Sequence, residues 1–165
     1  MPKKGSNLLA LSTAQNFAKR MNFGTTPIPE PSNKNIYRFD DTGNPLRHMW
    51  YDIVSANFVI QYQFQQDPGI FLNSKVPTES EAKSEAKNLL QTYGLYPTDF
   101  VGGDLRARFY KVAENSLVPV ASQSQADAVR VDFYRPNIAS TKIVNGTNGD
   151  GPISIVFSGS SNSKT

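Results

Sequence analysis

The chain has 165 residues, of which 38% are hydrophobic and 11% aromatic, values typical of a folded globular protein rather than a disordered one. Its 17 Lys and Arg against 14 Asp and Glu leave a net charge of +3, and because the basic residues are scattered, no nucleic-acid partner is indicated. Cysteine is absent, which excludes disulfides, thiol catalysis and cysteine-ligated metals.

The first predicted helix covers the stretch AQNFAKRMNF, residues 14–23. Its apolar side chains recur at i, i+3, i+4 and i+7, the spacing of one helix face, at Ala14, Phe17, Ala18 and Met21. Ser12 and Gln15 have the spacing of a capping box at its start, and Asn22 can adopt the left-handed conformation that ends a helix. We therefore expect a helix of about three turns.

Three strands are predicted after this helix, separated by turn-forming residues. A linker, TTPIPEPSNK, is followed by NIYRF, the turn DDTGNP, a strand around LRHMWYDIV and the alternating run NFVIQYQF. Alternation places the apolar side chains of that last run on one face of a strand: Phe58, Ile60, Tyr62 and Phe64.

The second half of the chain follows the same order. A helix over residues 79–93 is expected to begin at a capping box of Thr78 and Glu81 and to end at Gly94. Its apolar stripe consists of Ala86, Leu89, Leu90 and Tyr93, while its ESEAKSEAK start predicts a solvated outer face. Strands are predicted around LRARFYKV, LVPVA and DAVRVDFY, and a seventh at GPISIVFS.

The two halves match at nearly constant offsets. The helix stripes and their stop residues are 72 residues apart, the Arg-Phe pairs at 38–39 and 108–109 are 70 apart, and the long alternating strands are 71 apart. We interpret this as an α+β fold of tandemly duplicated αβββ units, residues 8–66 and 76–136, followed by a linker, an additional strand and a flexible tail over 137–165. Side by side, the units would form one longer antiparallel sheet with both helices on one face.

No catalytic or cofactor signature stands out, and we predict neither a cofactor nor a metal site. His48 is the only histidine, and alternation along RHMWYD places it with Trp50 and Asp52 on one strand face, so we interpret it as an ordinary strand residue. Asp40 and Asp41 are interpreted as turn residues rather than a carboxylate cluster. NGTNGDG lacks the spaced carboxylates of a calcium loop and is interpreted as a flexible turn.

One feature indicates binding. If the apolar side of the strands faces the helices, alternation turns a mixed set of Arg, Tyr, Trp and Gln to the other, open side. Such residues are enriched at protein interfaces, although a solvated polar sheet face has the same pattern. The candidate binding residues on this open face are Arg38, Trp50, Gln61, Gln63, Arg106, Arg108, Tyr110, Arg130, Asp132 and Tyr134.

The helices AQNFAKRMNF and EAKNLLQTYGL, followed by strands such as IYRF and VRVDFYRP, resemble PepSY-like and YycH/YycI-like extracytoplasmic regulatory domains of bacteria. The resemblance covers roughly residues 10–157 and rests on positions that determine the fold. It implies a non-enzymatic, extracytoplasmic module in a membrane-anchored protein, which senses or regulates through contact with another protein. No catalytic residue is carried over by it.

We therefore expect a binding or regulatory module whose partner is a protein, a cell-envelope component or a neighbouring domain of the same chain. The alternative is a secreted proteinaceous enzyme inhibitor; an enzyme is the weakest reading, because no cluster of acid, base or histidine residues can be assembled. No apolar run approaches the roughly 18–20 residues needed to cross a bilayer, so an anchor would lie in a segment absent from this sequence.

Overall fold

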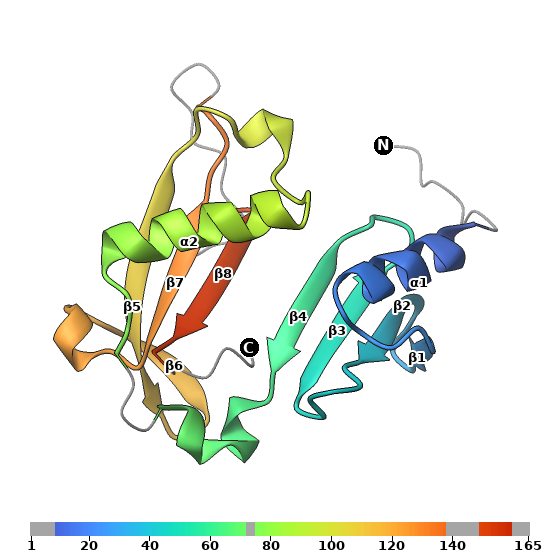
Figure 1. Ribbon diagram of the computed structural model, residues 1–165, viewed down its shortest axis with the longest axis horizontal. Helices are drawn as coiled ribbons and strands as arrows, with labels where there is room; N and C mark the ends of the chain where they lie inside the picture. Colours follow the sequence, from blue (N-terminus) through green and yellow to red (C-terminus); the bar gives the residue numbers. More distant parts are fainter. Residues whose placement is uncertain (1–8, 72–74, 138–148, 160–165) are drawn as a thin grey trace. The chain divides into compact units, whose positions relative to one another are not determined.

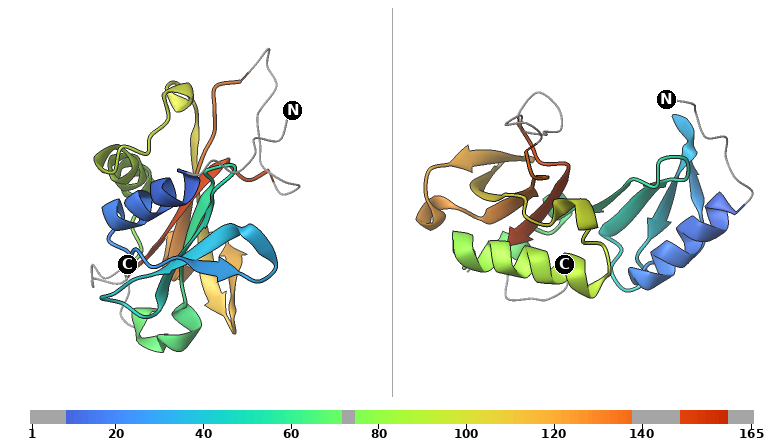
Figure 2. Two further views of the ribbon diagram at one scale, coloured as in Figure 1. Left: turned by 90° about the vertical axis from the view of Figure 1, so that its right-hand side faces the viewer. Right: turned by 90° about the horizontal axis from the view of Figure 1, so that it is seen from above.

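The computed structural model describes residues 9–71, 75–137 and 149–159. The chain divides into two compact units, one up to Asp67 and one from Pro68 onward. Each contains one α-helix and one four-stranded antiparallel sheet, and in each the helix lies across one face of its own sheet (Figures 1 and 2). The predicted α+β class and antiparallel pairing are confirmed.

The first unit is a helix followed by a four-stranded meander with the order β1-β2-β3-β4. Its elements are α1 (Ala10–Arg20), β1 (Ile28–Glu30), β2 (Asn33–Asp40), β3 (Arg47–Asp52) and β4 (Phe58–Tyr62). The second unit has the order β6-β5-β7-β8. Its elements are α2 (Glu79–Thr92), β5 (Leu105–Ala113), β6 (Ser116–Val120), β7 (Ala128–Phe133) and β8 (Ile153–Ser158).

Small residues let each helix approach its sheet closely. Ala14 and Ala18 of α1 and Ala82 and Ala86 of α2 are fully buried. The first core adds Phe39, Met49 and Tyr51 from the sheet, and the ring of Phe17 contacts those of Tyr51 and Phe58. The second core adds Leu90, Phe100, Val129, Val131 and Phe133. The predicted stripe of α2 is displaced, because Leu89 is exposed and Ala82 takes its place.

The helix ends follow local chemistry, with one exception. Thr78 and Glu81 form the predicted capping box, and Asn22 and Gly94 have the positive φ that closes a helix. The capping box predicted at Ser12 is wrong: α1 begins at Ala10, so Ser12 lies inside the helix, and no side chain caps its first turn.

The predicted single, longer sheet is also wrong, because β1–β4 and β5–β8 form two separate sheets. Each sheet has one strand more than the αβββ unit: β1 lies in the segment expected to be a linker, and β8, predicted as a seventh strand, pairs with β7 at the edge. The strands that correspond in sequence also differ in position, since β3 lies inside its sheet and β6 at an edge. The duplication itself remains a prediction.

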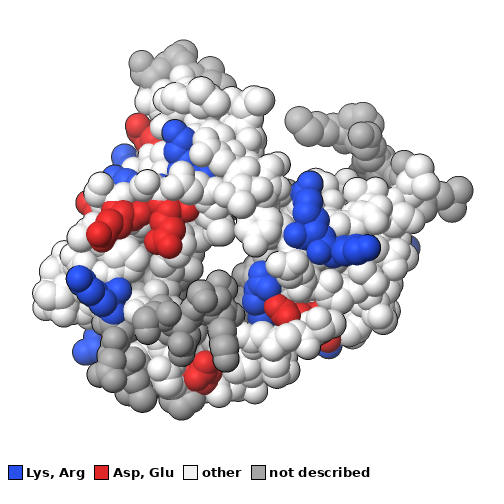
Figure 3. Space-filling model, viewed as in Figure 1, with Lys and Arg blue, Asp and Glu red and all other residues white. Residues whose placement is uncertain are grey.

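Alternation predicted the sheet faces correctly, but not the length of β4. This strand ends at Tyr62, and Phe64 belongs to a short 3-10 helix, so Phe64 does not continue the apolar face. The outer surface of α2 is exposed and charged, as predicted for a solvated helix face; in Figure 3 acidic side chains gather over α2 and basic ones over α1.

The caps allow a direct test of which hydroxyl groups stabilise a helix. Thr78→Ala should lower the free energy of unfolding of the second unit by about 1 kcal/mol, because it removes an N-cap acceptor. Ser12→Ala is the matched control and should cost nothing, because Ser12 is exposed within α1 and alanine favours the helix interior. Urea unfolding of both variants measures this, and an equal loss for both would contradict the cap assignments.

Candidate functional site

The predicted binding residues fall on two different sheets. Arg38, Trp50 and Gln61 lie on the face of the first sheet that α1 does not cover, and Gln63 follows the end of β4. The remaining residues lie on the corresponding face of the second sheet or directly after β7: Arg106, Arg108, Tyr110, Arg130, Asp132 and Tyr134. The ten residues therefore do not share one sheet face.

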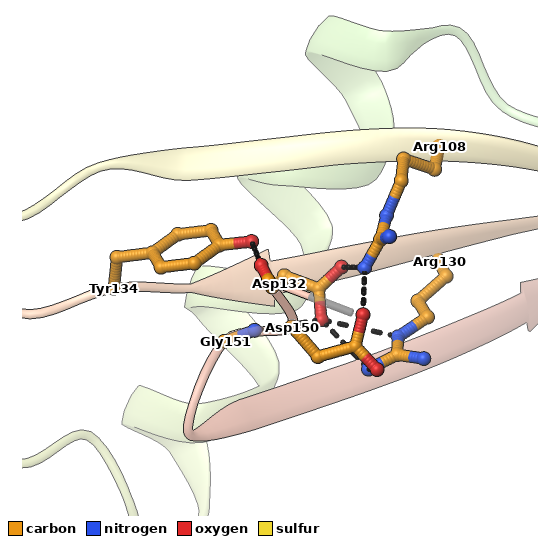
Figure 4. Close-up of polar contacts among 7 residues, drawn as sticks. Arg108, Arg130, Asp132, Tyr134, Asp150 and Gly151 are labelled. Carbon is orange, nitrogen blue, oxygen red and sulfur yellow. Dashed lines mark hydrogen bonds and ion pairs between the residues drawn. The ribbon is translucent and has the colours of Figure 1, made fainter. Parts of the chain in front are cut away.

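The face of the second sheet is less open than predicted. Asp132 has no exposed surface, and Tyr110 and Tyr134 are also buried. The segment before β8 covers Asp132 and Tyr134: the Gly151 N–H donates to Asp132 Oδ1 at 3.2 Å, and the Tyr134 hydroxyl donates to the Gly149 carbonyl at 2.7 Å (Figure 4). Alternation finds the face of a strand but cannot show what a later segment covers.

The chemistry of this face begins with two like charges. Arg108 of β5 and Arg130 of β7 lie directly opposite one another in the register of the sheet. Opposed like charges destabilise a strand pair, so a carboxylate must lie between them. Asp132, two residues along β7, and Asp150, just before β8, both do so; we call these four residues the Arg–Asp cluster.

Each arginine of the Arg–Asp cluster contacts both aspartates. Arg108 Nη2 lies 2.6 Å from Asp132 Oδ2 and 2.5 Å from Asp150 Oδ1. Arg130 Nη2 lies 2.9 Å from Asp132 Oδ1 and 3.1 Å from Asp150 Oδ2. The cluster is formally neutral, and its hydrogen bonds raise the pKa of Arg108, with Asp132 the larger cause and Asp150 the second. The hydrogen bond from Arg108 likewise lowers the pKa of Asp150.

A glycine is required where the covering segment reaches β7. A side chain built on Gly151 would overlap the backbone of Phe133 and approach the Cβ of Asp132 within 3.0 Å. Only a residue without a Cβ lets the Gly151 N–H reach the Asp132 carboxylate. Sequence reasoning missed Asp150 and Gly151; the one available signal was the excess of arginine over acid on β5 and β7.

The outer face of the first sheet has a different composition. A row of directly opposed residues crosses all four strands, consisting of Ile28, Arg38, Trp50 and Val59; we call it the outer row. Val59 is 60% exposed and Ile28 36%. The Trp50 indole N–H donates to Glu30 Oε2 at 3.2 Å, which holds the ring in place.

The neighbouring row corrects one prediction. Asp40 is not a turn residue: it is the last residue of β2 and lies opposite His48, with Asp40 Oδ1 2.7 Å from His48 Nδ1. The turn contains Asp41, whose Oδ1 accepts hydrogen bonds from the Gly43 and Asn44 N–H groups, as predicted for a turn. His48 is indeed a strand residue on the same face as Trp50, and their ring centroids are 5.8 Å apart.

Neither sheet face presents the groups of a metal site. Across the three described ranges, no three histidine or acidic side chains are grouped so that they could hold a metal ion. Of the stretch NGTNGDG, residues 145–148 lie outside the described ranges, and Asp150 contacts arginines. No helix in the described part of the chain is long and apolar enough to cross a membrane.

Comparison with known proteins adds no family to this description. No protein-family model, no curated protein and no solved structure matches the chain.

The Arg–Asp cluster makes a prediction for stability. Asp132→Asn should lower the free energy of unfolding by about 2–4 kcal/mol, because it removes a fully buried charge between two arginines. Asp150→Asn should cost less, about 1 kcal/mol, because this carboxylate is partly solvated. Urea unfolding at pH 7 compares the two, and an equal or reversed order would contradict the assigned burial.

The cost of Asp150→Asn should also depend on pH. The pKa of Asp150 is lower in the folded state than its ordinary value, so its contribution is complete above that ordinary value, about 4, and is lost as the pH falls through the folded pKa. The difference from the wild type should therefore be present at pH 7 and shrink as the pH is lowered below about 4. A difference that grows on acidification would contradict the ion pairs.

Proposed function

We propose that this protein is a non-enzymatic binding module whose first sheet contacts another protein through the outer row. The observation that carries the proposal is the exposure of apolar side chains around a fixed tryptophan. Trp50 lies between Arg38 and Val59 in the register, and the exposed side chains of Ile28 and Val59 stand at the two ends of the row, on the edge strands.

This composition supports a protein partner. Tryptophan and arginine are the residues most enriched among those that dominate binding energy, and polar residues typically surround such a centre. Here Asp40, His48 and Gln61 form the adjacent row. The hydrogen bond of Trp50 to Glu30 reduces the side-chain freedom that binding would have to remove.

The ion pairs of the second sheet favour the first sheet as the binding surface. Arg108 and Arg130 are already paired with Asp132 and Asp150, and a partner would have to replace those ion pairs before it could use these two arginines. Breaking ion pairs to a buried carboxylate opposes binding, because the charge left behind has no compensation. Arg38 also has a carboxylate neighbour, Asp40, but both of those side chains are more than one-third exposed.

Site-specific cross-linking in cells of the source organism tests the proposal. A photoreactive phenylalanine analogue at Ile28 should form a covalent adduct with a second protein, which mass spectrometry identifies. The same analogue at Asn16, an exposed position of α1, is the matched control and should form none. With the partner purified, Trp50→Ala should weaken binding by roughly 30-fold or more, the effect of losing a residue at the centre of an interface.

Two results would contradict the outer row as the binding surface. One is an adduct formed at Asn16 and not at Ile28. The other is an adduct at Ile28 whose yield Trp50→Ala leaves unchanged while the variant keeps the thermal stability of the wild type.

We also propose that the module acts outside the cytoplasm in a membrane-anchored protein, on the basis of the resemblance to PepSY-like and YycH/YycI-like domains. The native protein should then have a larger mass than these 165 residues and appear in the membrane fraction, with its binding unit open to added protease. A native protein of the same mass as this chain in the cytosolic fraction would contradict this.

A further inference from the structure

Each sheet has one edge strand that carries a proline at a position facing away from the sheet. In the first sheet this strand is β1. The Ile53 N–H donates to the Asn35 carbonyl at 2.9 Å, so alternate residues of β2, Asn35 and Tyr37 among them, bond to β3. Pro29 lies opposite Tyr37 and therefore has its nitrogen turned outward, where it cannot donate to an added strand.

The second sheet has the same arrangement at β6. The Tyr134 N–H donates to the Asp104 carbonyl at 2.9 Å. Because the direction of bonding alternates along an antiparallel strand, every second residue after Asp104 bonds to β7, and Tyr110 is one of these residues. Pro119 lies opposite Tyr110, so its nitrogen also faces the outer edge. In both sheets a proline therefore blocks strand addition at one edge.

The opposite edges carry no such block. Neither β4, with the sequence FVIQY, nor β8, with ISIVFS, contains a proline or a charged residue. Charges and prolines are the usual means by which an exposed edge strand avoids pairing with another chain. In the part of the chain that the structure describes, β4 pairs only with β3.

The backbone groups of β4 that face outward can be identified. The Asp52 N–H donates to the Asn57 carbonyl at 2.9 Å, and the Gln63 N–H donates to the Leu46 carbonyl at 2.8 Å. Odd-numbered residues of β4 therefore bond to β3, because the pattern alternates along an antiparallel strand. The N–H and C=O groups turned to the edge are those of Phe58, Ile60 and Tyr62.

We propose that β4 pairs with β4 of a second copy of this chain, antiparallel and about a two-fold axis at Ile60. Ile60 then lies opposite Ile60 of the second copy, and Phe58 opposite Tyr62. Every outward N–H and C=O of the strand finds a partner in this register, and the two four-stranded sheets become one eight-stranded sheet across the dimer.

An identical strand fits this edge for three reasons. The outward residues are symmetric about Ile60, so the strand is complementary to itself. No charge on β4 repels the same strand in a second copy. On the outer face, the exposed Val59 would lie opposite Gln61 of the second copy, and on the helix face Phe58, already in contact with the Phe17 ring, would meet Tyr62.

Sedimentation velocity over a range of concentrations tests the dimer. The wild-type chain and Ile60→Val should pass from monomer to dimer as the concentration rises, whereas Ile60→Pro should stay monomeric. The Ile60 N–H is not used by β3, so the proline removes an outward donor, as Pro29 and Pro119 do, and leaves the first sheet's own hydrogen bonds in place.

A second pair of variants avoids any effect on folding. Gln61 is exposed on the outer face, so Gln61→Lys should fold normally while adding the kind of charge that blocks an edge strand. It should weaken the dimer, and the matched control Gln61→Thr should not. Thermal unfolding of each variant establishes that the monomer is folded.

Amide hydrogen exchange gives a control within the strand itself. At low concentration the amides of Phe58, Ile60 and Tyr62 should exchange fast while those of Val59 and Gln61 remain protected by β3. At high concentration all five should be protected in the wild type, and the three outward amides should remain fast in Gln61→Lys.

Three results would overturn the proposal: a chain that is monomeric at every concentration, a dimer that persists in folded Ile60→Pro, and outward amides that are slow in the monomer. The outer row shares Val59 with β4, but its test rests on Trp50 of β3: Trp50→Ala changes a side chain away from the β4 edge and should leave the dimer intact. The dimer and the proposed protein binding can therefore fail independently.

Discussion

Two guanidinium groups, those of Arg108 and Arg130, lie opposite each other in the second sheet, and the outer side of that unit is organised around compensating them. Asp132 alone could not do so at low cost, because a buried carboxylate between two arginines leaves one positive charge in excess. Asp150 supplies the second negative charge, and by doing so it fixes the segment from which β8 begins. The segment that leads into β8 is thus held by a charge requirement that β5 and β7 set.

The same requirement distinguishes the outer faces of the two sheets. Both outer faces combine arginine, aromatic and acidic residues, and composition alone does not distinguish them. In the second sheet a later segment of the chain contacts the polar groups and buries Asp132, so the face is largely satisfied within the unit. In the first sheet, within the described residues, the acidic partners come from the sheet itself, and Val59, beside Trp50, and Ile28, on the edge strand β1, remain exposed. Among the described residues, the outer face with exposed apolar side chains is therefore the one that no later segment of its own unit covers.

The sequence predicted what depends on neighbouring residues. The capping box of Thr78 and Glu81 spans three residues, the stops at Asn22 and Gly94 are single-residue properties, and strand faces follow from a period of two. The failures depend on distant contacts. Ser12 has the right spacing for a cap, but the helix begins two residues before it. Gln15, the second residue of the predicted box, donates instead to the Thr25 carbonyl at 3.0 Å, a contact ten residues away that local spacing does not reveal.

In the candidate site, too, features set by neighbouring residues could be predicted and features set by distant contacts could not. Which residues of β5 and β7 share a face could be predicted, whereas the burial of Asp132 could not, because its cover comes from Gly151, 19 residues later. The order of the strands was equally out of reach: β5 and β7 pair although β6 lies between them in sequence. Matching offsets between the two halves therefore indicated similar elements without indicating how those elements pair.

Proline positions explain where each sheet can and cannot be extended. A sheet grows only at an edge whose outward amides can donate, and Pro29 and Pro119 remove that capacity from β1 and β6. Both prolines occupy outward positions, where they cost the sheet no hydrogen bond of its own, so blocking the edge is compatible with a regular strand. The first sheet is therefore blocked at its β1 edge and not at its β4 edge. An edge strand that has no charged residue and keeps all its outward N–H groups is a site for pairing. Its partner is another strand, because the outward N–H and C=O groups pair with the same backbone groups of a second strand.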